Sequence, residues 1–306
     1  METTHSTNNY IAEYIIDKLY PMVMDGYIPT IHDPVIGDGG FIINSIKYLH
    51  ERYPGINWEV NRANISGYEI NPEVHFSTLQ LLYEYTNIDF SNTIINYDCI
   101  KMYNPNKYDI IIADPCITNH QSSHTIRQSH TEISFIKYVM NMLNTDGRAA
   151  IIIKDRILTS DKKKYIKIRR KLLSQFNLHH IVSINIPGTS NICENKCSIL
   201  FFDNTGPTDT IEFYNITYDG NSLLETYETT ITHEQIAFNY YHINSYKKHV
   251  YIDNILIDSD SETSESSTTT ECDMISIDSI TSEDDETILS NTLGTLVINS
   301  SEQGML

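Results

Sequence analysis

The stretch YDIIIADPCITN (residues 108–119) is a hydrophobic run that stops abruptly at an acid and a proline. Its first six residues include three consecutive isoleucines, the near-continuous apolar pattern of a strand that is buried on both faces of a sheet. The run ends at Asp114-Pro115, and proline does not continue a central strand because it has no N–H to donate. The stretch therefore predicts a buried strand that delivers a carboxylate to the edge of a sheet.

Strand and helix patterns alternate on both sides of this stretch. Amphipathic helices are expected over residues 10–22, 41–53, 133–143 and 162–176, and another after Pro72. Short apolar strands are expected over 27–31, 93–97, 148–154, 179–186 and 196–202, and one ending near residue 69. Such alternation predicts an α/β fold, in which helices cover both faces of a mostly parallel sheet.

The acidic side chains are unevenly placed along the 306 residues. From Tyr251 onward there are 13 acids and no lysine or arginine, which leaves 27 acids against 21 bases before that point. This segment is rich in serine and threonine and has no aromatic residue after Tyr251, so it lacks the apolar surface that offsets the entropy of ordering. We therefore expect one domain over residues 1–250 and a disordered acidic tail over 251–306.

The spacing of the cysteines and the length of the apolar runs indicate the cell compartment in which the protein is expected. Five cysteines without a CxxC pair favour a reducing compartment. Cys193 and Cys197 lie near His179 and His180, but their spacing does not match the usual zinc motifs. No apolar run approaches 18 residues, so neither a membrane span nor a signal peptide is expected. We expect an intracellular, cytoplasmic protein, and the Asn/Ile/Tyr-rich composition suggests a large DNA virus or a parasite as its source.

Acidic side chains follow four of the predicted strands, at the edge where ligands bind in parallel sheets. The loop DPVIGDGGF (residues 33–41) follows a strand and opens a helix, and its glycines let the backbone approach a ligand closely. Glu69, Asp98 and Asp114 end the other three strands. There is no Gly-Lys-Ser/Thr motif, and the acids would repel a pyrophosphate. An uncharged or cationic nucleoside ligand fits this pattern better.

These motifs resemble, in content and in order, the modification subunit of type I restriction systems, a family of S-adenosylmethionine-dependent DNA adenine-N6 methyltransferases. The resemblance covers about residues 30–217. Its blocks are DPVIGDGGFI, SGYEINPEV, NYDCI, YDIIIADPCI, LNTDGRAAIIIKDRIL, IRRKLL, IVSINIP and CSILFF. It implies a Rossmann-like methyltransferase fold with a mostly parallel, seven-stranded sheet.

The resemblance also implies S-adenosyl-L-methionine as the cofactor. The glycine loop would hold the methionine part, with Asp33 near its amino group. Glu69 would bind the ribose hydroxyls, Ile70 would pack on the adenine ring and Asp98 would accept a hydrogen bond from the adenine amine. The cofactor-binding residues implied in this way are Asp33, Gly37, Gly39, Gly40, Glu69, Ile70 and Asp98.

The corner Asp114-Pro115-Cys116-Ile117 matches the family's catalytic motif, which usually reads NPPF or DPPY. The Asp114 side chain and the Pro115 carbonyl would accept the two hydrogens of the target adenine amine, once that base is turned out of the duplex. Cys116 stands in place of the second proline, and Ile117 in place of the aromatic residue that stacks on the base. The resemblance therefore implies a catalytic corner that keeps its acceptors and has lost its rigid, stacking half.

Three alternatives to DNA adenine methylation remain open from the sequence alone. One is a catalytically inactive scaffold with the methyltransferase fold, and another is methylation of a protein glutamine amide. A third takes Cys116 as the nucleophile of a cytosine methyltransferase with Glu194-Asn195 as its partner, which the downstream blocks disfavour. As an enzyme of the type I family, the chain would act on DNA with a separate specificity subunit. The basic segment 161–171 is the clearest candidate for phosphate contacts, although a solvated helix face would show the same pattern.

Overall fold

The computed structural model describes residues 9–19, 21, 23, 26–101, 105–115, 128–185 and 197–232, all of which belong to one unit of the chain, Met1–Ile257. Several sequence predictions concern residues outside the described part. These residues are Cys116, Ile117, Cys193, Glu194, Asn195 and the tail over 251–306. The predicted domain boundary at residue 250 stays a prediction.

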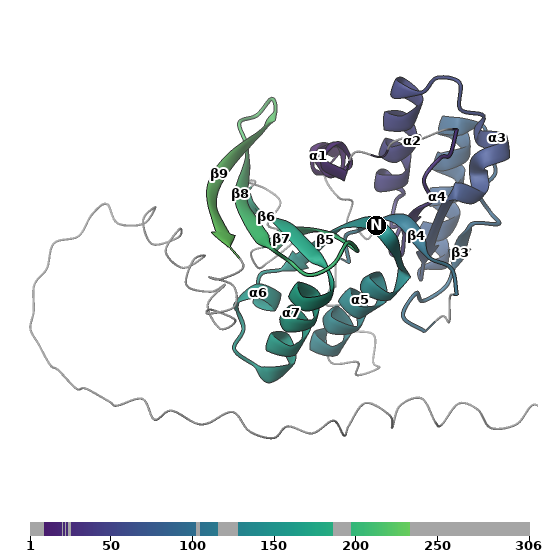
Figure 1. Cartoon of the computed structure of the whole chain (residues 1–306). Helices are drawn as coiled ribbons and strands as arrows, with labels where there is room; N and C mark the ends of the chain where they lie inside the picture. The colour runs from purple at the N-terminus through teal and green to yellow at the C-terminus, as the bar shows by residue number, and fades with distance from the viewer. Residues whose placement is uncertain are drawn as a thin grey trace, which may run out of the picture. The chain divides into compact units, whose positions relative to one another are not determined.

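The described strands form one sheet with the order β3-β2-β1-β4-β5-β7-β6-β8-β9 (Figure 1). Strands β1 to β5 are parallel, whereas β7 is antiparallel to both of its neighbours. The strand bounds are β1 Ile31–Asp33, β2 Ile65–Glu69, β3 Ile94–Asn96, β4 Tyr108–Ala113, β5 Leu143–Lys154, β6 Asn177–Asn185, β7 Cys197–Asp203, β8 Thr210–Tyr218 and β9 Leu223–Thr232. The predicted mostly parallel sheet is confirmed.

The sheet has nine strands within the described residues, so the expectation of seven is wrong. The additional strands β8 and β9 form a hairpin, with β8 parallel to β6 and β9 antiparallel to β8. In β9 only Ile231 is fully buried. An edge strand exposes one face to solvent and needs few apolar residues, so LLETYETTIT carries no apolar pattern that predicts a strand.

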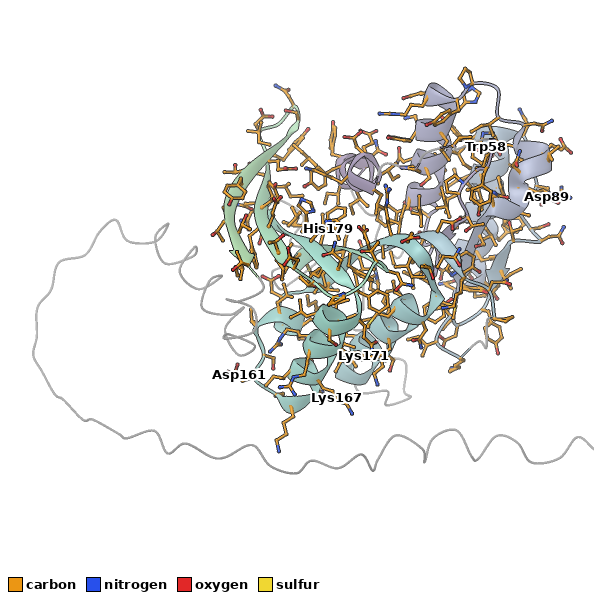
Figure 2. The ribbon with its side chains drawn as sticks, in the orientation of Figure 1. Trp58, Asp89, Asp161, Lys167, Lys171 and His179 are labelled. Carbon is orange, nitrogen blue, oxygen red and sulfur yellow. The ribbon has the colours of Figure 1, made fainter. Side chains whose placement is uncertain are left out.

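Helices cover both faces of the sheet (Figure 1). One apolar core contains side chains of α1 (Asn9–Leu19), α2 (Gly40–Arg52) and α4 (Pro72–Thr86), together with Trp58 of the short α3 (Trp58–Asn61), which Figure 2 labels. A second core lies on the other face. Its helices are α5 Gln128–Met142, α6 Arg156–Thr159 and α7 Lys163–Gln175. Among the described helices, none has the length and apolar character needed to cross a membrane.

Strand β4 contributes to both cores and lies between β1 and β5. Ile110 and Ile112 pack in the core with α1 and α2, whereas Ile111 and Ala113 pack in the core with α5 and α7. Successive side chains of a strand point to opposite faces, so a strand covered on both sides needs an apolar residue at every position. The isoleucine run was predicted to form such a strand, and the prediction is confirmed.

Candidate functional site

The predicted site residues lie beyond the carboxyl ends of neighbouring strands. Asp33 ends β1 and pairs in register with Gly67 of β2, which ends two residues later at Glu69. Asp114 follows the last residue of β4, the strand on the other side of β1. Because these strands are parallel and adjacent, their carboxyl ends meet at one edge of the sheet. The structure therefore gathers the strand-end acids as the sequence predicted.

The glycine loop between β1 and α2 is joined to β2 by two hydrogen bonds. The Gly37 N–H donates to Glu69 Oε2 at 3.1 Å, and the Ile36 N–H donates to the Tyr68 carbonyl at 2.9 Å. Gly37 and Gly39 have φ angles of 53° and 84°, in the left-handed region that favours glycine. Gly39 immediately precedes α2 and Gly40 is its first residue. The loop is thus held in one conformation, and its shape depends on Glu69.

Thr78 of α4 supports the same loop from the other side. Its hydroxyl donates to the Gly37 carbonyl and lies 2.9 Å from the Val74 carbonyl of its own helix. A Cβ added at Gly39 would lie 3.0 Å from Thr78 Cγ2, so the helix and the loop are in close contact. Thr78 is fully buried. The sequence analysis missed this residue because only the tertiary fold brings α4 against the loop.

Glu69 has both carboxylate oxygens engaged by backbone donors. In addition to the Gly37 N–H, it accepts the Asn71 N–H through Oε1 at 2.7 Å. A carboxylate has about four lone-pair sites, so capacity remains for further donors such as the hydroxyls of a ribose. The next residue, Ile70, is 66% exposed. An exposed apolar side chain beside an oriented carboxylate suits a ligand that has hydroxyl groups and a flat apolar ring.

Asp33 carries the strongest electrostatic signal of the site. The side chain is fully buried, and Oδ1 accepts the Val35 N–H at 3.0 Å, whereas Oδ2 has no hydrogen-bond partner among the described residues. Burial raises the pKa of this carboxyl well above its ordinary value, and the nearby charges of Asp114, Glu69 and Asp38 raise the pKa further. A cation beside Asp33 would favour the charged form of this carboxyl, so the group of strand-end acids suits a cationic ligand.

The position of Asp98 after β3 is as predicted, but its carboxylate has local partners. Oδ1 accepts the Ile100 N–H at 3.1 Å, and Oδ2 lies 3.2 Å from Lys101 Nζ. Burial raises the pKa of the neighbouring Cys99 thiol to about 12, with smaller contributions from the charges of Asp98 and Asp33. Asp98 therefore belongs to the same acidic edge as Asp33. Its predicted contact with a cofactor amine stays a prediction.

Only the first half of the catalytic corner lies within the described residues. Asp114 and Pro115 follow β4, and both are partly buried. The charge of Asp114 is close enough to raise the pKa of Asp33. Cys116 and Ile117, the two departures from the family motif, lie outside the described part. Asp114 thus lies near Asp33, and the catalytic roles of all four residues stay predictions.

Gly67 explains why β1 and β2 approach so closely beside the site. A Cβ at this position would lie 2.9 Å from the Asp33 carbonyl oxygen and 3.0 Å from Ile36 Cδ1. Real Cβ atoms essentially never approach backbone at that distance, so a larger residue would displace β1 or the glycine loop. Glycine in a strand interior often marks such a close approach of two backbones. Glycine at position 67 therefore allows β2 to pack closely against Asp33, while the same strand carries Glu69 at its end.

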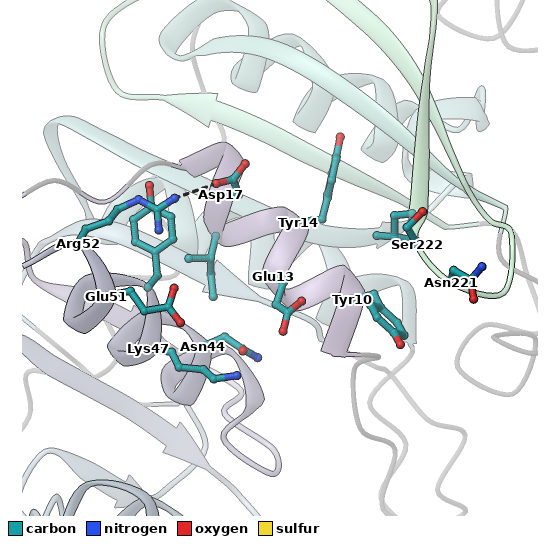
Figure 3. A pocket seen from close by; sticks show the side chains of 13 residues that line it. Tyr10, Glu13, Tyr14, Asp17, Asn44, Lys47, Glu51, Arg52, Asn221 and Ser222 are labelled. Atoms are coloured by element: carbon teal, nitrogen blue, oxygen red, sulfur yellow. Dashed lines mark hydrogen bonds and ion pairs between the residues drawn. The ribbon is translucent and has the colours of Figure 1, made fainter.

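A separate cleft of about 530 Å³ lies between α1, α2 and the turn that joins β8 to β9 (Figure 3). Its lining is of mixed charge and includes the ion pair between Asp17 and Arg52, whose atoms are 3.5 Å apart. None of the predicted site residues within the described part of the chain lines this cleft. The chemistry suggested by the sequence therefore belongs to the acidic edge of the sheet.

The two histidines considered beside Cys193 have carboxylate neighbours in the sheet. His179 Nε2 lies 3.4 Å from Asp203 Oδ1, and His180 Nε2 lies 3.1 Å from Glu212 Oε2. Across the described residues, no group of three or more His, Cys, Asp or Glu side chains is arranged to hold a metal ion.

Comparison with known proteins assigns the chain to a family. A family model described as N-6 DNA Methylase matches residues 7–286. The chain belongs to the N-6 DNA methylase family. This result confirms the resemblance drawn from the sequence motifs.

The N-6 DNA methylase chain is similar to methylase subunits of bacterial type I restriction enzymes. It is 23% identical over 230 residues to the EcoEI methylase subunit of Escherichia coli, which covers 69% of this chain and 44% of that protein. It is 24% identical over 208 residues to the StySJI methylase subunit of Salmonella typhimurium, and the match covers 62% of this chain and 39% of that protein. The chain thus spans less than half the length of these relatives. Since they are bacterial, they give no support to a viral or parasitic source.

Solved structures share the fold of this chain. The EcoKI M protein has a TM-score of 0.59 and 19% identity, over 76% of this chain and 52% of that one. A modification subunit of a type I restriction enzyme from Vibrio vulnificus YJ016 has a TM-score of 0.56 and 20% identity, over 83% and 53%. A class I S-adenosylmethionine-dependent methyltransferase from Listeria monocytogenes has a TM-score of 0.53 and 14% identity, over 70% and 67%. These likenesses support the Rossmann-like methyltransferase fold.

Proposed function

We propose that this chain transfers a methyl group from S-adenosylmethionine to the N6 amine of adenine in DNA. The observation that carries the proposal is the buried Oδ2 of Asp33, which has no hydrogen-bond partner among the described residues, near the Asp114-Pro115 corner. One feature suits a cationic ligand and the other suits the amine of a base, and both follow adjacent strands of the sheet. Membership of the N-6 DNA methylase family supports the same reaction.

The cofactor would supply the reactive methyl group on its sulfonium, and the chain supplies the groups that orient it. Asp33 would pair with the amino group, while the backbone of the glycine loop would lie along the methionine part. Glu69 would accept hydrogen bonds from the ribose hydroxyls, Ile70 would pack on the adenine ring and Asp98 would accept from the adenine amine. The hydrogen bond from Gly37 to Glu69 supports this assignment because it links the two halves of the pocket.

At the substrate side, Asp114 and the Pro115 carbonyl would accept the two hydrogens of the target amine. This arrangement directs the nitrogen lone pair away from the two acceptors and toward the methyl group, which is the orientation that transfer requires. The flipped base would reach the corner from the duplex. We further propose that DNA is bound with a separate specificity subunit, because the similar proteins are subunits of type I restriction enzymes.

Calorimetry with S-adenosylmethionine tests the cofactor half of the proposal. The wild-type chain is expected to bind the cofactor, and Glu69→Ala is expected to weaken binding at least about 100-fold, because two hydrogen bonds to a charged group are worth about 1.5–3 kcal/mol each. Glu73→Ala, an exposed change at the start of α4, serves as the matched control. An absence of binding heat in the wild-type chain would contradict the proposed function.

A further inference from the structure

The basic side chains of this protein are concentrated in one segment. Residues 161–171 contain seven of the chain's 21 lysines and arginines and a single acid, Asp161. The chain as a whole has a net charge of −19. A third of all positive charge thus lies within 11 residues of a strongly acidic protein. Such a concentration attracts polyanions locally, even where the net charge of the protein repels them.

Helix α7 separates these charges from its apolar residues. Tyr165, Ile168 and Leu172 are each at most 4% exposed and pack in the core with α5. Lys163 and Lys167 are exposed on the opposite side of the helix, and Lys164 and Lys171 are half-buried at the borders of this side. Figure 2 labels Lys167 and Lys171 on α7. We define the basic face of α7 by the lysines at helical spacing on this side, which are Lys163, Lys164, Lys167 and Lys171.

The basic face is unfavourable for the stability of the isolated helix. Residues 163, 167 and 171 are spaced by four, and like charges at that spacing destabilise a helix by about 0.2–0.5 kcal/mol per pair. Helix α7 contains no acidic residue, and its first turn carries two lysines, where the helix dipole disfavours cations. Within the described part of the chain, none of the four lysines forms an ion pair with a carboxylate. Nothing described in the fold neutralises this charge.

The fold brings the start of α7 to the same edge of the sheet as the candidate site. Strand β5 is parallel to β4 and ends at Lys154, so α6 and the start of α7 follow from the carboxyl edge that also carries Asp114. The buried Arg169 fixes this corner, because its Nη1 donates to the carbonyls of Ile157 at 2.7 Å and Ser160 at 3.0 Å. The basic face is therefore tied to this corner through Arg169, and it begins at the edge of the sheet that carries Asp114.

We infer that the basic face of α7 binds the phosphate backbone of the DNA duplex that carries the target adenine. This inference rests on the proposed function and names a DNA-contacting surface for it. From Lys163 to Lys171 the helix rises about 12 Å, at 1.5 Å per residue, a length that spans two or three phosphates of one strand. The lysines contact phosphates and position the duplex, whereas the sequence of the target is read elsewhere.

The test is fluorescence anisotropy of the full-length chain with a labelled duplex, at salt concentrations from 50 to 200 mM. The variant combines Lys164→Gln, Lys167→Gln and Lys171→Gln. Each lost phosphate contact lowers the slope of log affinity against log salt by about 0.9, so we expect the slope to fall by about 2–3 and the affinity at 100 mM to fall at least tenfold. A second variant with arginine at the same three positions is expected to keep the wild-type slope.

The matched control makes the same change of net charge elsewhere on exposed residues. It combines Lys47→Gln, Arg62→Gln and Lys107→Gln. Equal losses in the two glutamine variants, or no binding of the duplex by the wild-type chain at 50 mM salt, would overturn the inference. Calorimetry with S-adenosylmethionine on the same samples keeps the two claims apart. A chain that binds DNA through α7 without binding the cofactor would contradict the proposed function and still support the inference that the basic face binds DNA.

Discussion

Asp33 has a buried carboxyl group with one oxygen, Oδ2, that has no hydrogen-bond partner among the described residues. The pKa of the ligand-free carboxyl is raised well above its ordinary value, first by burial and then by the surrounding acids. A bound cation would favour the charged form and lower that pKa. At a pH below the raised pKa, binding of a cationic cofactor must therefore release a proton from Asp33.

Proton release by Asp33 gives a measurable pH dependence. We expect the affinity for S-adenosylmethionine to increase as the pH rises toward the raised pKa of Asp33, and to level off above it. Calorimetry at one pH in phosphate and in Tris, which differ in ionisation enthalpy, is expected to give different binding heats. Asp33→Asn is expected to weaken binding and to remove the buffer dependence. A wild-type heat that is identical in the two buffers would contradict the role of Asp33.

His32 precedes Asp33 and is fully buried, stacked on Tyr108 at 4.1 Å between ring centroids. Its ring nitrogens lie 2.8 Å from Ser66 Oγ and 3.1 Å from Tyr138 Oη. Burial lowers the pKa of His32 to about 3, from an ordinary value of 6.5. Between these two values the unfolded chain binds a proton that the folded chain does not. The contribution of His32 to stability is thus present above pH 6.5 and is lost as the pH falls.

The neutral His32 predicts acid sensitivity of the fold. Lowering the pH from 7 to 5 is expected to remove about 2 kcal/mol of unfolding free energy through this residue, at 1.36 kcal/mol per pH unit below 6.5. Urea unfolding of the wild type and of His32→Gln at both pH values measures it, because glutamine keeps hydrogen-bonding groups but does not titrate. The difference between the two proteins isolates His32 from neighbouring acids. A pH effect of equal size in both would refute the prediction.

At the scale of elements, the glycine loop is contacted by Glu69 and Thr78. Sequence patterns predict the first of these residues and not the second. Glu69 is recognisable because a strand pattern ends at an acid before Asn71-Pro72, and Asn71 caps α4 as such residues commonly do. Thr78 gives no such signal. It lies in the middle of a helix, where the helix propensity of threonine is low and no sequence motif marks it. Its role is evident only from the packing of α4 against the loop.

The contact between Thr78 and the loop predicts a specific loss. Thr78→Val keeps the shape of the side chain but removes the donor to the Gly37 carbonyl. We expect a loss of about 1–3 kcal/mol of unfolding free energy, and weaker cofactor binding because the loop is no longer held. Thr78→Ser retains the hydroxyl and is the control. Urea unfolding and calorimetry compare the two variants, and equal behaviour would show that the hydroxyl does not support the loop.

The same contrast holds for whole strands and helices. The strands β4 and β5 were predictable because buried parallel strands carry long apolar runs. The strand before the glycine loop was predicted over residues 27–31, but β1 has the sequence Ile-His-Asp and overlaps that range only at Ile31. The short α6 was missed because four residues are too few to show helical periodicity. The hairpin of β8 and β9 was also missed, since β9 is largely exposed and its Thr- and Glu-rich sequence resembles that of a loop. Sequence patterns thus revealed the elements with a long apolar run or a clear helical period, and missed the four-residue α6 and the hairpin.

At the scale of the whole molecule, charge is the dominant feature. Residues 251–306 carry 13 acids and no lysine or arginine, so a chain that ends at residue 250 has a net charge of −6 instead of −19. Removal of this segment is expected to change the unfolding free energy by less than about 0.5 kcal/mol, if the predicted boundary at residue 250 is correct.

The shortened chain is also expected to bind DNA more tightly, with the larger gain at low salt, where repulsion between the acids and the phosphates is least screened. Urea unfolding and anisotropy titrations of the two chains measure both effects. A large loss of stability would place part of the folded unit beyond residue 250. A gain in affinity that does not depend on salt would exclude charge repulsion as its cause.

The central claim is methyl transfer to adenine, and its most direct test is incorporation of label from S-adenosylmethionine into unmethylated duplex DNA. We expect label in N6-methyladenine with the wild-type chain and none with Asp114→Ala. The double variant Cys116→Pro, Ile117→Tyr is expected to be about 5- to 150-fold more active, because a stacked aromatic ring is worth about 1–3 kcal/mol per base. If neither the wild type nor the double variant labels adenine although both bind the cofactor and the duplex, the proposed reaction is wrong.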